Sequence, residues 1–111
     1  MKFTQSLKKN YQFRFVYNKG KSVANKYLVM YAIKNNSNEN FIGISVSKKV
    51  GNSVVRSRVT RLIRESYRLN EHKLKNGYSF VIIARNLTNG AKYQEIEKAL
   101  NHLLFKHNLI K

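Results

Sequence analysis

The stretch from Lys48 to Arg68, KKVGNSVVRSRVTRLIRESYR, constrains this chain most strongly because it carries two patterns at once. At about 100° per residue, an apolar stripe lies on one side of a helix and basic residues lie on the other. The stripe consists of Val55, Val59, Leu62, Ile63 and Ser66. The stretch therefore predicts a helix with one face packed on a core and the other open to anions.

The basic side of this predicted helix is the first candidate binding surface. Arginine binds phosphate in a fork and stacks on bases, and the small residues 51–53 stand where a helix start needs a cap and its free N–H groups attract phosphate. The basic residues of the stretch are Lys48, Lys49, Arg56, Arg58, Arg61, Arg64 and Arg68, and its only acid is Glu65. An ordinary solvated face is the alternative, although such faces usually mix both signs of charge.

The charge of the whole chain points in the same direction. Its 22 Lys and Arg against 5 Asp and Glu give a net charge of +17, an excess that a polyanion would neutralise. We predict nucleic acid as the partner and no membrane, because the apolar residues opposite the basic face are needed for the core. The 111 residues fit one domain, and without cysteine or a signal-like apolar run we expect a cytoplasmic protein.

The first part of the chain predicts a helix rich in aromatic residues. Ser6 or Asn10 is expected to cap it, and it should run to about Asn18 with Gly20 as its stop. Its apolar residues form two stripes, Leu7 with Tyr11 and Phe15, and Phe13 with Val16 and Tyr17. Either all these rings belong to the core, or one stripe packs and the other lies on the surface; the sequence leaves both open.

The remaining segments alternate between strand and helix patterns. Strands are expected at 21–25, 27–34, 41–47 and 78–84, and a last helix at 93–106. The asparagine-rich turn between the second and third strands predicts a hairpin, in which Leu28, Met30 and Ala32 face the core. The basic helix between the third and fourth strands predicts a β-α-β unit.

The residues needed for catalysis on the protein itself are scarce. The chain has no aspartate, and its carboxylate side chains are Glu39, Glu65, Glu71, Glu95 and Glu97. Metal-dependent phosphodiester cleavage usually needs carboxylates clustered around the cation, and these are scattered. The histidines, His72, His102 and His107, are expected on the surface. The composition indicates a binder, or the protein half of an enzyme whose chemistry lies elsewhere.

The motif KKVGNSVVRSRVTRLIRE resembles the signature of the bacterial ribonuclease P protein subunit: a lysine pair, a glycine-asparagine turn, and an Arg-Asn-Arg motif followed by further arginines. LKKNYQFRFVYNKG, SVAN, ISVSKKVGN and FVIIAR also look like family segments in family order, so the resemblance covers nearly the whole chain. Ser57 stands where the family has asparagine, and Thr60 where a basic residue is expected. Serine lacks the amide, which affects any RNA contact that needs both donor and acceptor there.

The resemblance implies an α+β fold, a single-domain α/β sandwich over residues 1–111 in the order α-β-β-β-α-β-α. It also implies a left-handed β-α-β crossover around the basic helix, whereas general statistics favour a right-handed one.

The resemblance further implies a role as the protein subunit that joins a large catalytic RNA and assists removal of the 5′ leader from precursor tRNA. The RNA is expected to perform the hydrolysis with magnesium ions, and the protein alone to be inactive. Catalytic RNA and precursor tRNA are the expected partners, without an obligate protein partner. A non-catalytic RNA-binding protein, such as a ribosomal component, is the alternative, and a protein-only nuclease is disfavoured by the few carboxylates.

Site residues follow from the matching positions. The surface toward the catalytic RNA is expected to comprise Lys48, Lys49, Asn52, Arg56, Ser57, Arg58, Arg61, Arg64 and Arg68. Phe13, Tyr17 and Tyr31 are expected to line a central cleft for the leader, where stacking suits a strand of variable sequence. Strand alternation adds Tyr27, Phe41, Ser45 and Ser47 as weaker candidates for this cleft.

Overall fold

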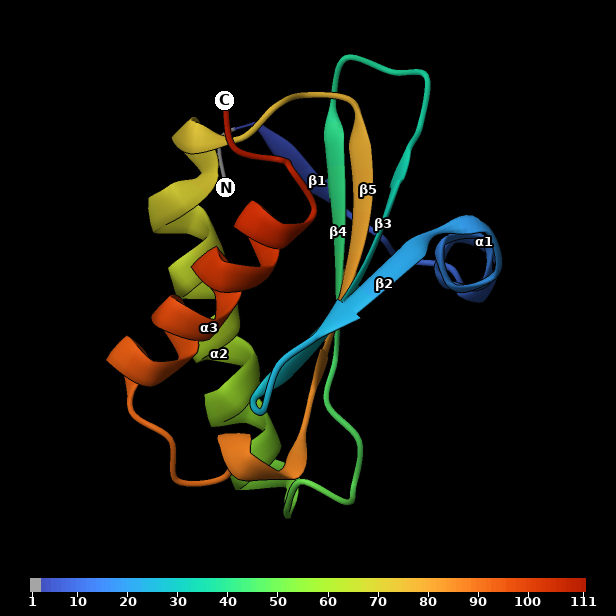
Figure 1. Cartoon of the computed structure of the whole chain (residues 1–111). Coiled ribbons are helices and arrows are strands. Elements are labelled where there is room, and N and C mark those ends of the chain that lie inside the picture. Colours follow the sequence, from blue (N-terminus) through green and yellow to red (C-terminus); the bar gives the residue numbers. More distant parts are fainter. Residues whose placement is uncertain (1–2) are drawn as a thin grey trace.

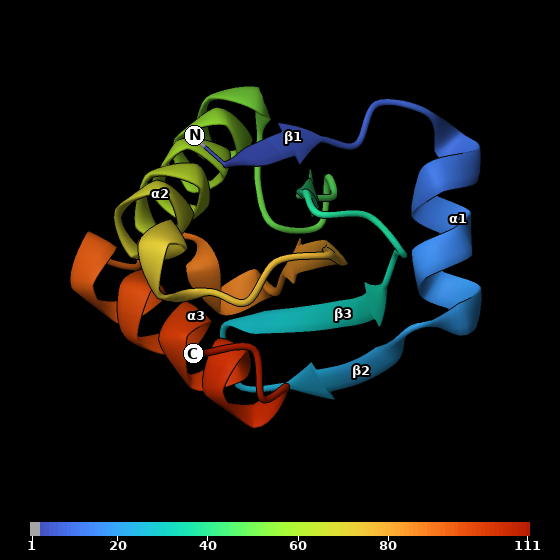
Figure 2. The ribbon, with the colours of Figure 1, turned by 90° about the horizontal axis from the view of Figure 1, so that it is seen from above.

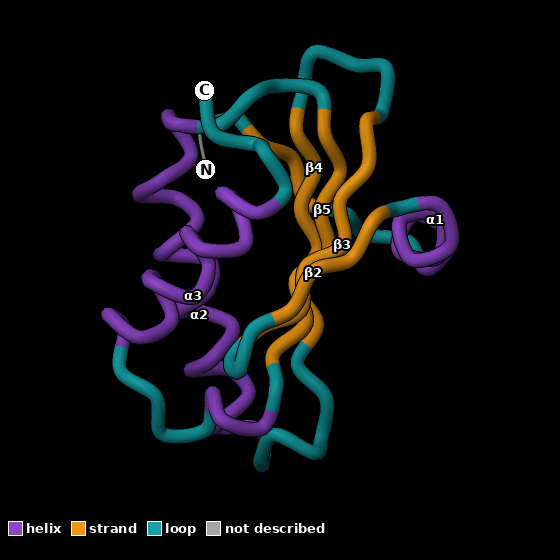
Figure 3. The backbone as a smooth tube through the Cα atoms, in the orientation of Figure 1, coloured by secondary structure: helices purple, strands orange, loops and turns teal. Residues whose placement is uncertain are grey.

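The computed structural model describes residues 3–111 as one mixed sheet between two helical layers (Figure 1). In chain order the elements are β1 (Thr4–Ser6), α1 (Asn10–Lys19), β2 (Lys21–Ala24), β3 (Leu28–Lys34), β4 (Asn40–Ser45), α2 (Ser53–Asn70), β5 (Tyr78–Ala84) and α3 (Tyr93–Lys106). Short 3-10 turns lie at Glu71–Lys73 and Asn86–Thr88. Helices α2 and α3 cover one face of the sheet and α1 covers the other (Figure 3). The predicted α+β sandwich is confirmed, with one additional strand, β1, before the first helix.

The sheet is built around β5. The strand order is β1-β4-β5-β3-β2, and β5 pairs parallel with β4 and antiparallel with β3. Its sequence YSFVIIA is almost entirely apolar, which suits a strand buried on both faces. The predicted hairpin between β3 and β4 is therefore wrong, because β5 lies between these two strands. Periodicity defines the faces of a strand, whereas the choice of neighbour depends on contacts far apart in the sequence.

The β4-α2-β5 unit has the expected left hand. In Figure 1, β4 runs downward, α2 returns upward on the left of the sheet, and β5 runs downward again. Seen from above, β5 lies on the β3 side of β4 (Figure 2), in agreement with the strand order. This arrangement makes the crossover left-handed, although right-handed crossovers dominate among proteins.

The main core lies between the sheet and the layer formed by α2 and α3. Leu28, Met30 and Ala32 of β3 point into it, as the alternation predicts. From α2, the stripe contributes the buried side chains of Val59 and Ile63. The other buried contributors include Phe80, Ile82, Ile96, Leu100, Leu103 and Leu104. No helix within residues 3–111 is long and apolar enough to cross a bilayer.

Helix α1 begins without either of its two expected caps. Ser6 belongs to β1, and Asn10 is already the first residue of the helix, with Lys9 at the capping position. The side chain of Gln12 accepts hydrogen bonds from the N–H groups of Lys8 and Lys9 at 2.9 Å. At the other end Gly20 terminates the helix, and a Cβ there would lie 2.5 Å from the carbonyl oxygen of Val16. A side chain at position 20 would therefore disturb the last turn of α1.

Strand β1 has no signature in the sequence, because the segment TQS is short and polar. It pairs parallel with Asn40–Ile42 of β4. Thr4 Oγ1 donates to the buried carboxylate of Glu71 at 2.6 Å and lies 2.9 Å from the hydroxyl of Tyr67. Burial raises the pKa of Tyr67 to about 12, so this hydroxyl keeps its proton. Tertiary hydrogen bonds therefore fix β1 in place.

Candidate nucleic-acid interface

A basic groove runs along α2 beside the end of β4. Asn52 caps this helix by accepting a hydrogen bond from the N–H of Val55 at 3.0 Å, which fixes where the arginine-bearing turns begin. The groove has a volume of about 800 Å³. It is lined by Ile44, Val46, Ser53, Val54, Arg56, Ser57, Thr60, Arg61 and Arg64. Four of the predicted RNA-binding residues, the three arginines and Ser57, are thus brought together on one surface.

The groove arginines differ in how deeply they are buried. Arg61 and Arg64 are exposed, so their guanidinium groups are available to phosphate. Arg56 is half-buried, and its Nε is buried without a hydrogen-bond partner among residues 3–111. Thr60, which replaces the basic residue expected there, donates its hydroxyl to the backbone carbonyl of Arg56 at 2.9 Å. The groove therefore has one half-buried inner arginine and two exposed outer ones.

The other predicted basic contacts lie outside the groove lining. Arg58 points toward the loop before α3, where its Nη2 donates to the carbonyl of Ala91 at 2.8 Å. Arg68 forms a salt bridge with Glu65, and this guanidinium lowers the pKa of the Glu65 carboxyl. Arg58 therefore also contributes to the fold, and Arg68 has part of its charge neutralised within the helix.

Exposed residues extend the basic surface beyond the helix start. Lys48 and Lys49 are exposed in the turn that joins β4 to α2. Ser47 begins this turn, and its carbonyl accepts a hydrogen bond from the N–H of Val50 at 3.1 Å. Ser47 is thus placed at the lysine turn, apart from the residues that line the aromatic cleft described next.

An aromatic cleft lies between α1 and the end of β4. It is lined by Asn10, Phe13, Arg14, Tyr17, Ile44 and Ser45. Phe13 lies directly over Gly43, where an added Cβ would come within 2.4 Å of the ring. Glycine is therefore required at position 43 for the ring to lie this low on the sheet.

Tyr17 lines the aromatic cleft and connects it to Tyr31 of β3. The ring of Tyr17 meets that of Tyr31 edge to face, with centroids 5.1 Å apart. Burial raises the pKa of the Tyr17 hydroxyl, more than its hydrogen bond with Ser45 lowers it. The structure thus brings together four predicted cleft residues: Phe13, Tyr17, Tyr31 and Ser45.

The basic groove and the aromatic cleft meet at the edge of β4. Strand β1 covers only Asn40–Ile42 of that edge, and Ile44 lies beyond it. Ile44 lines both the groove and the cleft. A single chain of nucleic acid can therefore contact arginines and aromatic rings without leaving this edge.

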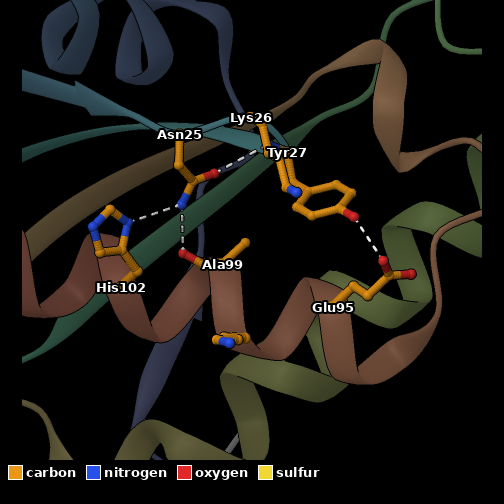
Figure 4. A pocket seen from close by; sticks show the side chains of 7 residues that line it. Asn25, Lys26, Tyr27, Glu95, Ala99 and His102 are labelled. Atoms are coloured by element: carbon orange, nitrogen blue, oxygen red, sulfur yellow. Dashed lines mark hydrogen bonds between the residues drawn. The ribbon is translucent and has the colours of Figure 1, made fainter.

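Tyr27 does not belong to the cleft, contrary to the strand alternation. Asn25 accepts hydrogen bonds from the N–H groups of Tyr27 and Leu28 at 3.1 and 3.0 Å, so the strand pattern starts only at Leu28. The hydroxyl of Tyr27 donates to Glu95 of α3 at 2.7 Å, on the opposite face of the sheet (Figure 4). Phe41 does face the α1 side but lines a different groove, at the other end of β4.

Asn10 and Arg14 are cleft residues that the sequence reasoning missed. With Phe13 and Tyr17 they recur at three- and four-residue spacing, which places all four on one side of α1. Helical spacing alone could have identified them, because the two predicted cleft rings already define that side. Arg14 adds an exposed cation to the rim of the cleft.

Titratable groups within residues 3–111 form no cluster of three or more that could hold a metal ion. His72 and His102 are exposed as predicted, whereas His107 is half-buried and its Nε2 lies 2.9 Å from the carbonyl oxygen of Met30. Burial lowers the pKa of His107, so the neutral ring donates this hydrogen bond. The surface position expected for His107 is wrong because α3 brings its last turn against the sheet.

Comparisons with known proteins agree with this geometry. The family model of ribonuclease P matches residues 1–108. The ribonuclease P protein component of Alkaliphilus oremlandii is 56% identical over 110 residues, which cover 99% of this chain and 96% of that protein. The solved RNase P protein of Staphylococcus aureus has a TM-score of 0.88 at 34% identity and covers 96% of this chain and 97% of its own.

A more distant solved structure shows the same fold. The RNase P protein of Thermotoga maritima has a TM-score of 0.82 at 27% identity, with 90% of this chain and 94% of that chain covered. Both the family match and the identity span nearly all of the sequence. The chain therefore belongs to the ribonuclease P protein component family, the protein subunits of the endoribonuclease holoenzyme of tRNA processing.

Proposed function

We propose that this subunit binds the catalytic RNA of ribonuclease P through the basic groove of α2 and binds the single-stranded 5′ leader of precursor tRNA in the aromatic cleft. The observation that carries the proposal is the shared lining residue Ile44, which places the two surfaces side by side. A substrate held in the cleft therefore lies next to the RNA held in the groove.

The chemistry of each surface suits its proposed ligand. Arg61 and Arg64 offer planar donors that pair with phosphates of a folded RNA, a contact that does not depend on sequence. In the cleft, Phe13 and Tyr17 offer faces and edges on which bases stack, and every base has such a face. The cleft therefore fits a leader whose sequence varies among tRNAs.

We further propose that magnesium ions and the hydrolytic step reside on the RNA. Bound there, magnesium would activate water and stabilise the leaving oxygen. The carboxylates of this chain are engaged elsewhere: Glu65 with Arg68, Glu39 with Gln5, and Glu97 with Asn70 and Tyr93. Glu95 accepts from Tyr27 and from the N–H of Lys92, and these contacts lower its pKa. This chain's part is to bind and orient RNA.

The test is cleavage of a precursor tRNA at low magnesium by a bacterial ribonuclease P RNA, with and without the protein. Ribonuclease-treated protein alone serves as the control for activity of the protein itself. Stimulation that requires the RNA supports the proposal. Absence of stimulation, combined with tight binding to unrelated RNAs, would instead indicate a general RNA-binding protein.

A further inference from the structure

A second groove lies on the opposite flank of α1 from the aromatic cleft. Its apolar wall is formed by Leu7, Tyr11, Phe15 and Phe41, and its volume is about 360 Å³. It opens on the same face of the sheet as the cleft, because Phe41 and Ser45 point to the same side of β4. We call it the outer groove.

The two rings that α1 contributes to the outer groove are not needed for packing. Tyr11 is 63% exposed and Phe15 is 50% exposed, whereas Val16 of the same helix is 1% exposed and anchors it to the sheet. Positions 11 and 15 are four residues apart, so the two rings are neighbours along the helix. They form an apolar, ring-bearing surface on a protein with a charge of +17.

The surroundings of the outer groove are suited to an anion. Lys34 is exposed at the end of β3 and lines the groove, and the exposed Lys8 follows Leu7 in the chain. Glu39 is the one acid of the neighbouring loop, and its Oε2 accepts from Gln5 Nε2 at 3.0 Å. The groove therefore combines stacking surfaces with uncompensated positive charge, which favours a nucleic acid over an apolar protein segment.

The wall of the outer groove is already formed in the free protein. Asn35 accepts a hydrogen bond from the N–H of Ser37 at 2.9 Å and donates to the carbonyl of Glu39 at 3.0 Å. It also donates to the hydroxyl of Ser79 at 3.2 Å. These bonds hold the 35–39 loop against β5, so ligand binding does not have to order this loop.

A path over α1 connects the aromatic cleft to the outer groove. At about 100° per residue, Arg14, which lines the cleft, is followed around the helix by Tyr11 and then Phe15. All three side chains are exposed. An α-helix is about 10 Å across, a distance that about three to five nucleotides span.

We propose that the outer groove binds the bases of single-stranded RNA, namely leader nucleotides upstream of those held in the aromatic cleft. This inference rests on the proposed function of the cleft and extends it by a second stacking site. The leader passes over Arg14, and its upstream bases stack on Tyr11 and Phe15 while Lys34 contacts a phosphate. Long leaders therefore bind more tightly than short ones.

The first test is a direct report of stacking. The chain contains no tryptophan, so Phe15→Trp introduces a single indole into the outer groove. Titration with a single-stranded oligouridine of about 16 nucleotides is expected to quench its emission, because stacking places a base on the ring. Phe105→Trp is the matched control, since Phe105 is 71% exposed on α3, on the opposite face of the sheet. Equal quenching in both variants, or no quenching in either, overturns the proposal.

The second test separates the outer groove from the aromatic cleft. Holoenzyme carrying Tyr11→Ala with Phe15→Ala is compared on precursor tRNAs with leaders of about 4 and about 16 nucleotides. We expect binding of the long-leader substrate to weaken at least fivefold, roughly one lost stacking contact, and binding of the short-leader substrate to remain unchanged. Phe105→Ala should alter neither.

Each remaining outcome has one meaning. If the double variant binds both substrates normally while Phe13→Ala weakens both, the cleft assignment stands and the outer groove is excluded as a leader site. If Phe13→Ala is also without effect, the proposed function of the cleft fails with it. If the double variant changes the oligomeric state of the unbound protein by light scattering, the rings serve a second copy of the chain and the RNA proposal is overturned.

Discussion

The two faces of the sheet are packed in opposite ways, although the same strands form both. Toward α2 and α3, side chains such as Met30, Phe80 and Ile82 are completely buried in one continuous core. Toward α1, the buried apolar side chains among residues 3–111 are Val16 and Val81, and the rings around them remain partly open. One face forms the closed core, and the other leaves aromatic surface open to solvent.

This comparison shows why the chain carries more aromatic residues than its core uses. A closed core gains free energy in proportion to the apolar area removed from water. One short helix, α1, covers the other face, so several of its rings stay exposed and gain little of this free energy in the free protein. These rings can still bury their apolar area against a ligand, and the free energy gained would then stabilise the complex.

The closed face gives the largest expected effect. Phe80→Ala removes a fully buried ring that contacts Tyr67 and Tyr78, and we expect the free energy of unfolding to fall by about 3–5 kcal/mol. Thermal or urea unfolding measures it. Phe105→Ala, at an exposed position, should change stability by less than about 0.5 kcal/mol. Equal losses from both substitutions would contradict the division into a closed and an open face.

The open face is probed by Gly43→Ala. The added methyl group would lie 2.4 Å from the ring of Phe13 and must displace it, at a cost of about 1–3 kcal/mol. We expect the ratio of affinities for precursor and mature tRNA to shrink, as it should for Phe13→Ala and Tyr17→Ala, while affinity for the catalytic RNA is retained. If the effects of Gly43→Ala and Phe13→Ala on this ratio are additive in a double-mutant cycle, the glycine does not act through the ring of Phe13.

The surface of α2, the helix that covers the closed face, is probed at two arginines with different surroundings. Arg61→Ala should weaken binding to the catalytic RNA and reduce the slope of log K against log salt by about 1, with unchanged thermal stability. Arg58→Ala should shallow the slope too, but it also removes the bond to Ala91 and lowers stability by about 1–2 kcal/mol.

Salt titrations of binding, together with unfolding curves, distinguish these two arginines. If Arg61→Ala and Arg58→Ala lower the free energy of unfolding equally, Arg61 also contributes to the fold, and the expected difference between the two arginines is wrong. An unchanged salt slope for both would remove α2 from the RNA interface.

The smallest effect is expected at the edge of the closed face, where His107 contacts Met30. Burial lowers the pKa of the folded-state ring below its ordinary 6.5, so the unfolded chain binds the proton more readily. The neutral, buried ring of His107 therefore contributes fully to stability above pH 6.5, and this contribution is lost as the pH falls from there through the folded-state pKa. Unfolding measured at several pH values should show this loss in the wild type and not in His107→Gln. An identical pH dependence in both would contradict it.

Much of the architecture was predictable from local patterns. The basic helix and its buried stripe follow from a 3.6-residue period, and its start after Asn52 follows from the small residues 51–53. The segment YSFVIIA is almost entirely apolar because β5 is covered on both faces. The groove arginines follow from the same period, since a helix fixes which side chains share a side. Phe13 and Tyr17 were assigned to the cleft from the resemblance to the family, because their spacing left open whether they belong to the core.

Other features depend on contacts that no local pattern contains. The predicted hairpin of β3 and β4 failed because β5, more than thirty residues later in the chain, lies between them. Tyr27 left the cleft because Asn25 forms a turn that resets the strand alternation. Strand β1 forms because Glu71 and the edge of β4 offer partners to three polar residues.

The sequence by itself determined the charge, the helix faces and the set of basic and aromatic side chains proposed to bind RNA. Only the tertiary structure decided that the arginines and the rings meet at Ile44, and that α1 leaves one groove on each of its flanks. The physical reason is that periodicity sets the orientation of a side chain about its own element, whereas strand order and helix placement result from the burial of the whole apolar surface at once.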